Sequence, residues 1–362
     1  MGSRERLLID TIIGQPRTAA DRYDRDMNVL FFKADDNELA EEFKKFLPVN
    51  VTTSYSTMEP ALVQAEAKFI IPVLGTALTA RMAGYFNLTS EERTDAKMNR
   101  VLSLIQAAEL RLAYWDSFDQ LAVTITDHGL EDTMGDNRVY RYQSDGLRDN
   151  LNRQGYEMLE LLVEFLESES TDFPEWDSSE CCTHNIKSVI QDSKRFFEIV
   201  SFKRDYRLYL VLRQYITATE RMELPFRIGE ALAGIMTEHT EDVGAGTRFA
   251  LLYPMAQMFV AFWALADGLP VLQGHITPDG VVVMQESASY SASGRTNQLA
   301  NDKVITSMQE RFRGMAEYYA GRMVEYLNGH SADFPEWEVS KPSSEGYRLH
   351  ERSNARKKSF HV

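Results

Sequence analysis

Two glutamates stand in settings that could support acid–base chemistry. Glu66 and Glu220 each interrupt an otherwise apolar helical pattern, and they occupy equivalent positions when the two halves of the chain are aligned on Gly75 and Gly229. Carboxyl groups that converge can act as a general acid and a general base, because burial or mutual repulsion raises one of their pKa values. Repeat-equivalent residues usually occupy separate cores, so a structural ion pair in each copy is the alternative. We expect the ion pairs and predict no catalytic residue.

A second candidate is the run Cys181-Cys182-Thr183-His184, whose thiols and imidazole are of the types that bind zinc. It supplies three ligands at most, lies between the two repeats described below, and lacks the paired spacing of zinc sites. Most histidines fall in predicted turns and tails, at positions 128, 184, 239, 275, 330, 350 and 361. We therefore predict no metal site.

Phosphate and hydrolase motifs are also missing from the sequence. Gly244-Ala245-Gly246 follows an acidic loop and lacks the Lys-Ser or Lys-Thr that would complete a phosphate-binding loop, so we interpret it as a connector. No H-E-x-x-H, G-x-S-x-G or paired C-x-x-C occurs. The sequence predicts neither an enzyme nor a bound cofactor.

Composition narrows the class of protein. The 362 residues are 44% hydrophobic and 26% charged, which is typical of a globular chain of about two domains. A net charge of -15 disfavours tight nucleic-acid binding, and no long uncharged apolar stretch indicates a membrane span. The amino terminus lacks the features of a secretory signal, and two adjacent cysteines exclude a disulfide-built secreted domain. Basic residues gather only in the last segment, which we interpret as a basic tail.

An internal repeat organises the whole chain. Phe173-Pro174-Glu175-Trp176 recurs as Phe334-Pro335-Glu336-Trp337, each time after an Asp and a helical pattern. The first copy runs from about Asn37 to Asp177 and the second from about Gln191 to Val339. We predict an N-terminal extension over 1–36, helical repeats over 37–180 and 181–340, and a basic C-terminal tail over 341–362.

Each copy predicts three helices after a short amphipathic segment. The first ends at Leu74-Gly75 or Ile228-Gly229, and the second places Trp115 or Trp263 in its last turn. The third ends at the Phe-Pro-Glu-Trp turn, which we interpret as a structural lock whose aromatic rings enter the core. The apolar stripe of the first helix in the first copy is Leu62, Ala65, Phe69 and Val73. The stripes of the second helix are Val101, Ile105, Ala108, Leu112 and Trp115 in the first copy, and Phe249, Tyr253, Ala256, Val260 and Trp263 in the second. The stripes of the third helix are Leu147, Leu151, Met158, Leu162 and Phe165 in the first copy, and Met308, Phe312, Met315, Tyr319, Met323 and Tyr326 in the second.

A hairpin is predicted between the second and third helices of each copy. Alternating residues (Leu121, Val123 and Ile125; Leu269 and Val271) precede turn sequences, and strand-favouring runs follow at 139–142 and 281–283. The predicted fold is therefore mainly α with β-hairpin arms, a tandem repeat of a three-helix bundle unit with an inserted hairpin. Because such an arm has few apolar residues to pack on the core, it is suited to pairing with another subunit.

Beyond this periodicity, the stretch from Asn185 to Met236 carries a recognisable combination of residues. It comprises Phe196-Phe197, Arg207-Leu208, Leu212, Ile216, Glu220 and Ile228-Gly229-Glu230-Ala231-Leu232, after the Trp176 motif. In these residues the chain resembles an uncharacterised structural protein family of Bacteroidetes phages and prophages (crAss-like and related). The resemblance covers most of both repeats, and its motifs mark packing rather than activity.

The resemblance implies a virion structural protein assembled in the bacterial host cytoplasm, similar to head-to-tail adaptor or neck ring proteins. Its expected partners are other copies of itself in a ring, the portal and neighbouring neck or tail proteins, with DNA passing through the lumen without specific binding and no membrane. One alternative is a tail-associated or ejected cargo protein. Another is an enzyme with a site between the repeats, motivated only by Glu66 and Glu220.

Overall fold

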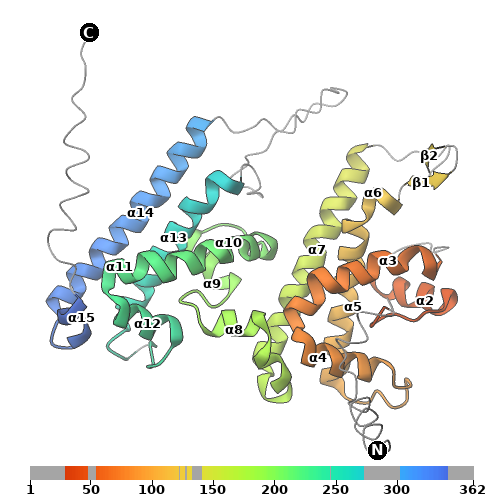
Figure 1. Cartoon of the computed structure of the whole chain (residues 1–362), viewed down its shortest axis with the longest axis horizontal. Coiled ribbons are helices and arrows are strands. Elements are labelled where there is room, and N and C mark those ends of the chain that lie inside the picture. Colours follow the sequence, from red (N-terminus) through yellow and green to blue (C-terminus); the bar gives the residue numbers. More distant parts are fainter. Residues whose placement is uncertain are drawn as a thin grey trace, which may run out of the picture. The chain divides into compact units, whose positions relative to one another are not determined.

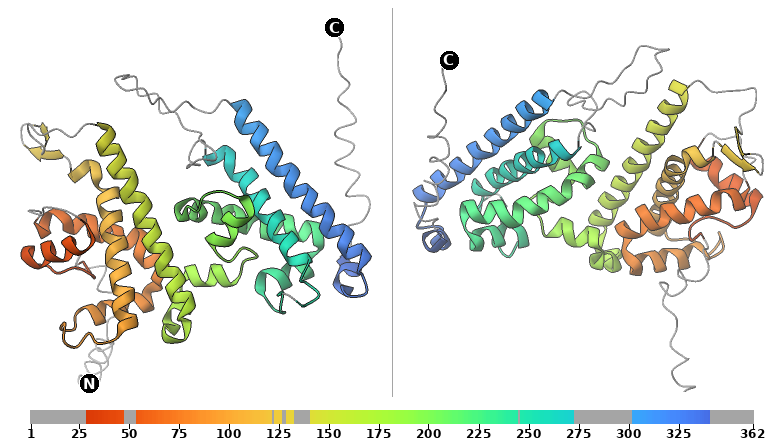
Figure 2. Two further views of the ribbon diagram at one scale, coloured as in Figure 1. Left: turned by 180° about the vertical axis from the view of Figure 1, so that it is seen from behind. Right: turned by 45° about the horizontal axis from the view of Figure 1, so that its top comes forward.

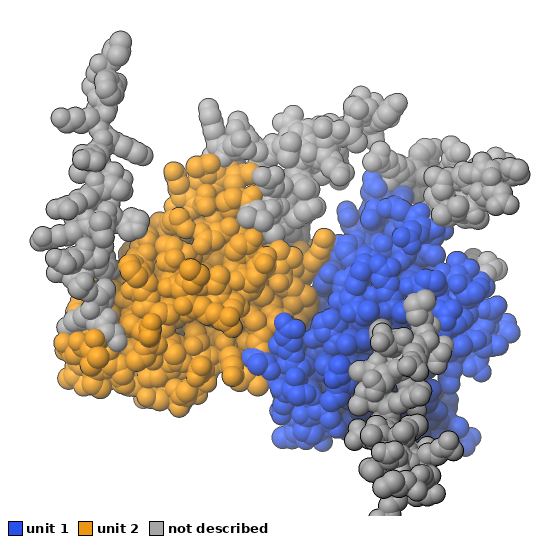
Figure 3. Space-filling view, viewed as in Figure 1, with its two compact units in different colours: residues 1–183 blue, residues 184–362 orange. Residues whose placement is uncertain are grey.

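The chain folds into two compact units that divide between Thr183 and His184. The computed structural model describes residues 29–47, 54–121, 123–126, 129–132, 141–244, 246–272 and 302–340. Figure 1 shows that both units are built mainly from helices, and Figure 3 colours the two units separately. The predicted basic tail, the hairpin of the second copy and the first 28 residues lie outside the described residues.

Unit 1 is a bundle around one long central helix. Helix α5 has buried side chains on more than one face and packs along α7, α3, α4 and α2. In order, the elements are α2 (Asp36–Phe46), α3 (Tyr55–Ala65), the π-helical turn η1 (Glu66–Ile70), α4 (Ile71–Phe86), α5 (Ala96–Asp116), α6 (Phe118–Leu121), β1 (Val123–Thr126), β2 (Gly129–Asp132), α7 (Arg141–Ser168), η2 (Ser170–Asp172), η3 (Pro174–Ser178) and α8 (Glu180–Ile186), whose last residues belong to unit 2.

Unit 2 repeats this arrangement. Its central helix α13 packs along α14, α10 and α9, as α5 packs along its neighbours in unit 1 (Figures 1 and 2). The elements are α9 (Ser193–Val200), α10 (Tyr206–Ala218), the π-helical turn η4 (Thr219–Glu223), α11 (Leu224–Ile228), α12 (Glu230–Glu238), α13 (Leu252–Leu272), α14 (Asp302–Gly329) and α15 (Pro335–Ser340). The mainly helical fold and the tandem repeat predicted from the sequence are thereby confirmed.

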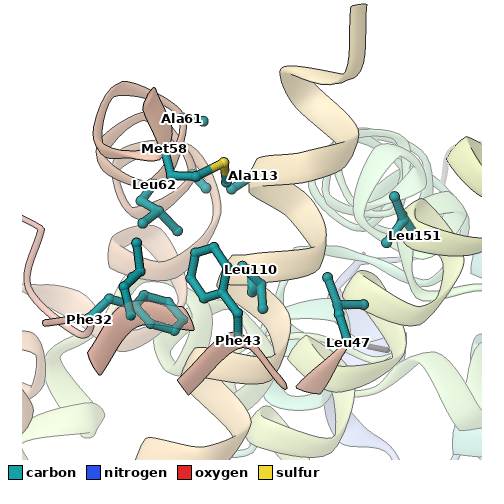
Figure 4. Packing of buried hydrophobic residues seen from close by; sticks show 11 residues of the cluster. Phe32, Phe43, Leu47, Met58, Ala61, Leu62, Leu110, Ala113 and Leu151 are labelled. Atoms are coloured by element: carbon teal, nitrogen blue, oxygen red, sulfur yellow. The ribbon is translucent and has the colours of Figure 1, made fainter. Parts of the chain in front are cut away.

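Apolar stripes from separate helices close one core in each unit. In unit 1, Phe43 of α2, Met58 and Leu62 of α3, and Leu110 and Ala113 of α5 meet in a single cluster (Figure 4). Asp35 caps α2 by accepting backbone amides of its first turn, and Asp192 caps α9 in the same way. Both short helices are thus fixed at their start and buried along one face.

A glycine breaks the first long helix of each copy, as the sequence predicts. Gly75 has φ 74° and ψ 161°, and Gly229 has φ 87° and ψ 150°, a backbone region that side chains exclude. The break in unit 1 leaves the Val73 carbonyl free to accept the Nε1–H of Trp176 at 3.0 Å. Ser179 sits directly against Gly75, so the break is also where the Phe-Pro-Glu-Trp turn is seated.

The predicted hairpins are partly wrong. In the first copy β1 pairs with β2 in antiparallel register, with Val123 opposite Asp132. Of the predicted return strand 139–142, Arg141 and Tyr142 belong to α7, and residues 139 and 140 lie outside the described residues. In the second copy Leu269 and Val271 belong to α13 and not to a strand. The helical pattern continues there because α13 packs closely on α10.

Gly268 permits that close packing. A Cβ atom at this position would lie 2.8 Å from a methyl group of Leu212 in α10. The next residue, Leu269, is buried. The short alternating run therefore reflects a helix that is buried on nearly every side, which apolar periodicity alone does not separate from a strand.

The stretch Tyr55–Phe86 is long and apolar enough, by length and composition only, to cross a membrane. It consists of α3, η1 and α4 in succession. Met58, Leu62, Leu74 and Leu78 are buried within unit 1, and Gly75 interrupts the helix. Core helices of water-soluble bundles share this composition.

Gly75→Ala is expected to destabilise unit 1 by about 2–4 kcal/mol, because the added methyl group forces an excluded φ and meets Ser179. Urea unfolding measures the change. Gly84→Ala in the same helix is the control: nothing lies within 4 Å of its Cβ position, so a gain of about 0.5–1 kcal/mol is expected. Equal effects at the two glycines would contradict the role of Gly75.

Candidate functional site

Each of the two candidate glutamates lies in a π-helical turn. Glu66 opens η1 and Glu220 lies in η4. Each turn precedes a proline in the next helix, Pro72 or Pro225, which has no N–H for the carbonyl four residues earlier and crowds it sterically. Widening the helix by one residue removes that conflict: the amides of Ile71 and Leu224 donate five residues back. The wider turns carry the glutamates inward, where both are buried.

The carboxyl group of Glu66 holds an extended segment that precedes the first helix. Its Oε1 accepts the backbone N–H of Leu30 at 2.6 Å. Gln106 of α5 donates its Nε2–H to the Phe31 carbonyl at 2.7 Å, and the side chains of Phe31 and Phe32 are buried. The segment 29–33, which we name the first lead-in segment, is therefore fixed to the bundle by side chains rather than by a β-ladder.

Glu220 does the same for the segment that precedes α9 within unit 2. Its Oε1 accepts the N–H of Val189 at 2.7 Å and the hydroxyl of Ser188 at 2.8 Å. The Val189 carbonyl accepts from Gln257 at 3.1 Å and from Tyr253 at 2.9 Å. The segment 188–190, the second lead-in segment, is thus held by the same kinds of groups.

These contacts overturn the predicted ion pairs. Among the described residues, no lysine or arginine forms a salt bridge with Glu66 or Glu220. Each carboxyl group instead satisfies buried backbone amides, which a helical bundle cannot satisfy through its own ladder. The segment 29–33 lies in the predicted N-terminal extension, and it has a counterpart in the segment 188–190 between α8 and α9.

Burial governs the electrostatics of both positions. It raises the pKa of Glu66 to about 7, against the opposing effect of the Leu30 amide. It raises the pKa of Glu220 to about 7 as well, against the hydrogen bonds from Ser188 and Val189. Each carboxyl group accepts hydrogen bonds from the lead-in segment of its own unit.

Glu109 is a buried acid that the sequence analysis missed. It lies on α5 next to Glu66 and is fully buried, and its pKa is raised well above the ordinary value first by burial and then by the charge of Glu66. The signal was a glutamate six residues before Trp115, within the apolar centre of the helix. In the second copy Gln257 stands six residues before Trp263.

The Phe-Pro-Glu-Trp turns are structural locks, as predicted. The rings of Phe173, Trp176, Phe334 and Trp337 are almost completely buried. An arginine holds each turn from outside: Arg81 bonds the Asp172 carbonyl and the Glu175 carboxylate, and Arg248 bonds the Asp333 carbonyl and the Glu336 carboxylate. Arg81 lies in α4 and Arg248 in the loop before α13, so the two arginines are not equivalent positions. Aligning the two copies of the repeat therefore does not reveal them.

The cysteine–histidine run forms part of α8. Both thiols are buried, and burial raises the pKa of Cys182 to about 11. His184 bonds Thr217 at 2.9 Å, and burial lowers its pKa to about 4. In the described part of the chain, no group of three or more metal-ligating side chains converges.

Comparison with known proteins places the repeat in a family. A family model described as a family of unknown function (DUF6712) matches residues 70–186 and again residues 230–346. Each match spans the helix after the glycine region, the central helix, the third helix and the closing turn. No curated protein and no solved structure matches the chain.

Ser188→Ala is expected to destabilise unit 2 by about 1–3 kcal/mol near neutral pH, because it removes one of the donors to the buried carboxylate of Glu220. The cost should shrink at pH 5, where Glu220 is protonated and needs fewer donors. Denaturant unfolding at both pH values measures it. Ser178→Ala, at an exposed hydroxyl, is the control, and a similar loss there would contradict the assignment.

Arg248→Gln is expected to cost about 1–2 kcal/mol, because both partners of its ion pair with Glu336 are only about a quarter exposed. Arg81→Gln should cost less, about 0.5–1 kcal/mol, because Arg81 and Glu175 are each 35% exposed. Thermal unfolding of the two variants compares them. The reverse order would show that the closing turn of unit 2 does not depend on its arginine.

Proposed function

Since the chain belongs to this family of unknown function through both of its repeats, we propose that it is a non-enzymatic structural subunit of a phage virion. In this proposal it forms a homo-oligomeric ring of the head-to-tail connector, as an adaptor or neck ring component. The resemblance to phage structural proteins supplies the setting. The geometry supports an assembly role, because the buried acids of both units are engaged in holding the fold.

The observation that carries the proposal is a set of exposed apolar side chains specific to unit 2. Met222 and Phe226 are 70% and 57% exposed, four residues apart on η4 and α11. Tyr318 is 60% exposed on α14, which contacts α11 through the Arg227–Glu317 ion pair. We name these three residues the apolar face of unit 2. Large exposed apolar groups gathered on adjoining helices are typical of surfaces that become buried on association.

The first copy serves as an internal reference for this face. When the copies are aligned on Gly75 and Gly229, which break the first long helices, Lys68 is equivalent to Met222. When they are aligned on the Phe-Pro-Glu-Trp turns, Glu157 is equivalent to Tyr318. Both residues of unit 1 form ion pairs, with Asp116 and Arg153. A fold that accepts charged residues at these positions does not require the apolar ones, so their presence in unit 2 supports a contact with a neighbouring subunit.

The β1–β2 hairpin supports the same proposal. Within the described residues it is a sheet of two strands only, and such ribbons are marginal in isolation. Both outer strand edges can receive a strand from another subunit. We propose that it is an arm of the ring, with the hairpin predicted for the second copy as its counterpart.

The net negative charge of the chain is consistent with a ring whose lumen DNA passes through. A net charge of -15 repels a phosphate backbone, so DNA would slide through the lumen without binding. The basic residues of 341–362 would then dock on an acidic neighbour such as the portal or another neck or tail protein.

Two other functions remain as alternatives. A tail-associated or ejected cargo protein would leave the particle with the genome, whereas a ring subunit stays behind. Comparing the protein content of full and emptied particles separates these two. An enzyme with a site between the repeats is the other alternative; Glu66 and Glu220, which motivate it, each bind a lead-in segment of their own unit.

The double variant Met222→Asp/Phe226→Asp is expected to abolish ring assembly without unfolding the chain, because both side chains are exposed in the single subunit. Light scattering or native mass spectrometry, alone and with the portal, measures assembly, and circular dichroism measures the fold. Glu91→Lys, at an exposed residue of unit 1, is the matched control and should assemble normally. A chain that stays monomeric under all these conditions and is absent from purified virions would overturn the proposal.

A further inference from the structure

The core of unit 1 contains more buried acceptors than donors. Glu66 Oε2 and both oxygens of Glu109 are buried without a hydrogen-bond donor among the described residues. Glu66 and Glu109 are both 0% exposed. Two ionised carboxylates in this position would place adjacent negative charges in an apolar core, which costs far more than burying one neutral acid.

The second copy avoids this arrangement by a single difference. Gln257 takes the place of Glu109, and its amide donates to the Val189 carbonyl while its oxygen accepts from Arg195 at 2.9 Å. Glu220 therefore has no acidic neighbour on the central helix, and its own charge is met by the Ser188 hydroxyl and the Val189 amide.

We propose that Glu66 and Glu109 form a proton-sharing carboxyl pair that holds the first lead-in segment only while it keeps its proton. The shared proton supplies the missing donor: the O–H of one acid donates to the other, while Oε1 of Glu66 accepts the Leu30 amide. Loss of that proton drives the two carboxylates apart and releases the segment 29–33 from the bundle. Unit 1 thus has a release device at raised pH that unit 2 lacks.

The surrounding charges do not neutralise the pair. Glu42 of α2 adds a further negative charge, and the hydroxyl of Tyr55 in α3 donates to Glu59 rather than to the pair. The nearby cations Lys33, Lys45 and Arg93 act on Glu42 rather than on the pair. The raised pKa values of both acids agree with this arrangement.

The direction of the pH effect follows from these pKa values. Below the ordinary glutamate pKa of 4.5, the folded and unfolded chains both hold the protons, and the contribution of the pair to the stability of unit 1 is greatest. As pH rises from there, the unfolded chain releases the protons of both glutamates, while the folded pair keeps both up to about 7 and the shared one beyond it, so stability falls. Ionisation of Glu109, whose pKa is higher still, continues the loss into alkaline pH.

Hydrogen exchange of the full chain at pH 6, 7.5 and 9, expressed as protection factors, tests the proposal. Protection of Leu30 and Phe31 is expected to fall at least about tenfold more across this range than protection of Val189 and Ile190, since one pKa unit corresponds to a tenfold change. Glu109→Gln, which supplies a permanent amide donor, should keep the first lead-in segment protected at pH 9. The exposed substitution Glu91→Gln should behave as the unaltered chain.

Two results would overturn the proposal. One is parallel loss of protection in both lead-in segments of the unaltered chain, a comparison that needs no variant and stands even if Glu109→Gln does not fold. The other is a folded Glu109→Gln protein that still releases Leu30 at pH 9. Either would show that general alkaline loosening, and not the carboxyl pair, controls the segment.

Discussion

The need of a buried backbone amide for an acceptor shapes both units of this protein. A strand that enters a helical bundle finds no ladder to join, so its N–H and C=O groups need side-chain partners. A glutamate on a widened helical turn and a glutamine on the central helix provide them in each copy. In each copy, the glutamate, the π-helical turn that carries it and the proline after that turn therefore act together. They fix the entering segment, and the helices pack around it.

Sequence reasoning located the glutamates, the kink glycines and the closing turns, because each recurs at a fixed distance from an identical neighbour. It misjudged what the glutamates bind. A carboxylate in an apolar pattern is equally consistent with a cation partner or with backbone amides, and the lead-in segments that supply those amides lie 36 and 31 residues away from them. Glu109 escaped notice for a related reason, since its partner is another acid and pattern analysis searches for opposite charges.

The secondary-structure prediction was wrong where the helix is most completely buried. Leu269 and Val271 alternate as strand residues do, yet they end a helix that is enclosed on most sides. The helix–strand distinction depends on which residues face solvent, and a fully enclosed element has no polar face to set its period. Where a face is exposed, as along α7, the helical prediction was confirmed.

The placement of the lead-in segments also bears on how such a chain arises. Each copy carries its own entering segment, its own central helix and its own aromatic closing turn. A gene segment that encodes one copy is therefore a complete heritable module, and tandem copying creates no half-built core for selection to repair. After the copying event, surfaces could diverge separately, as Lys68 and Met222 show, while the interior stayed recognisable in both copies.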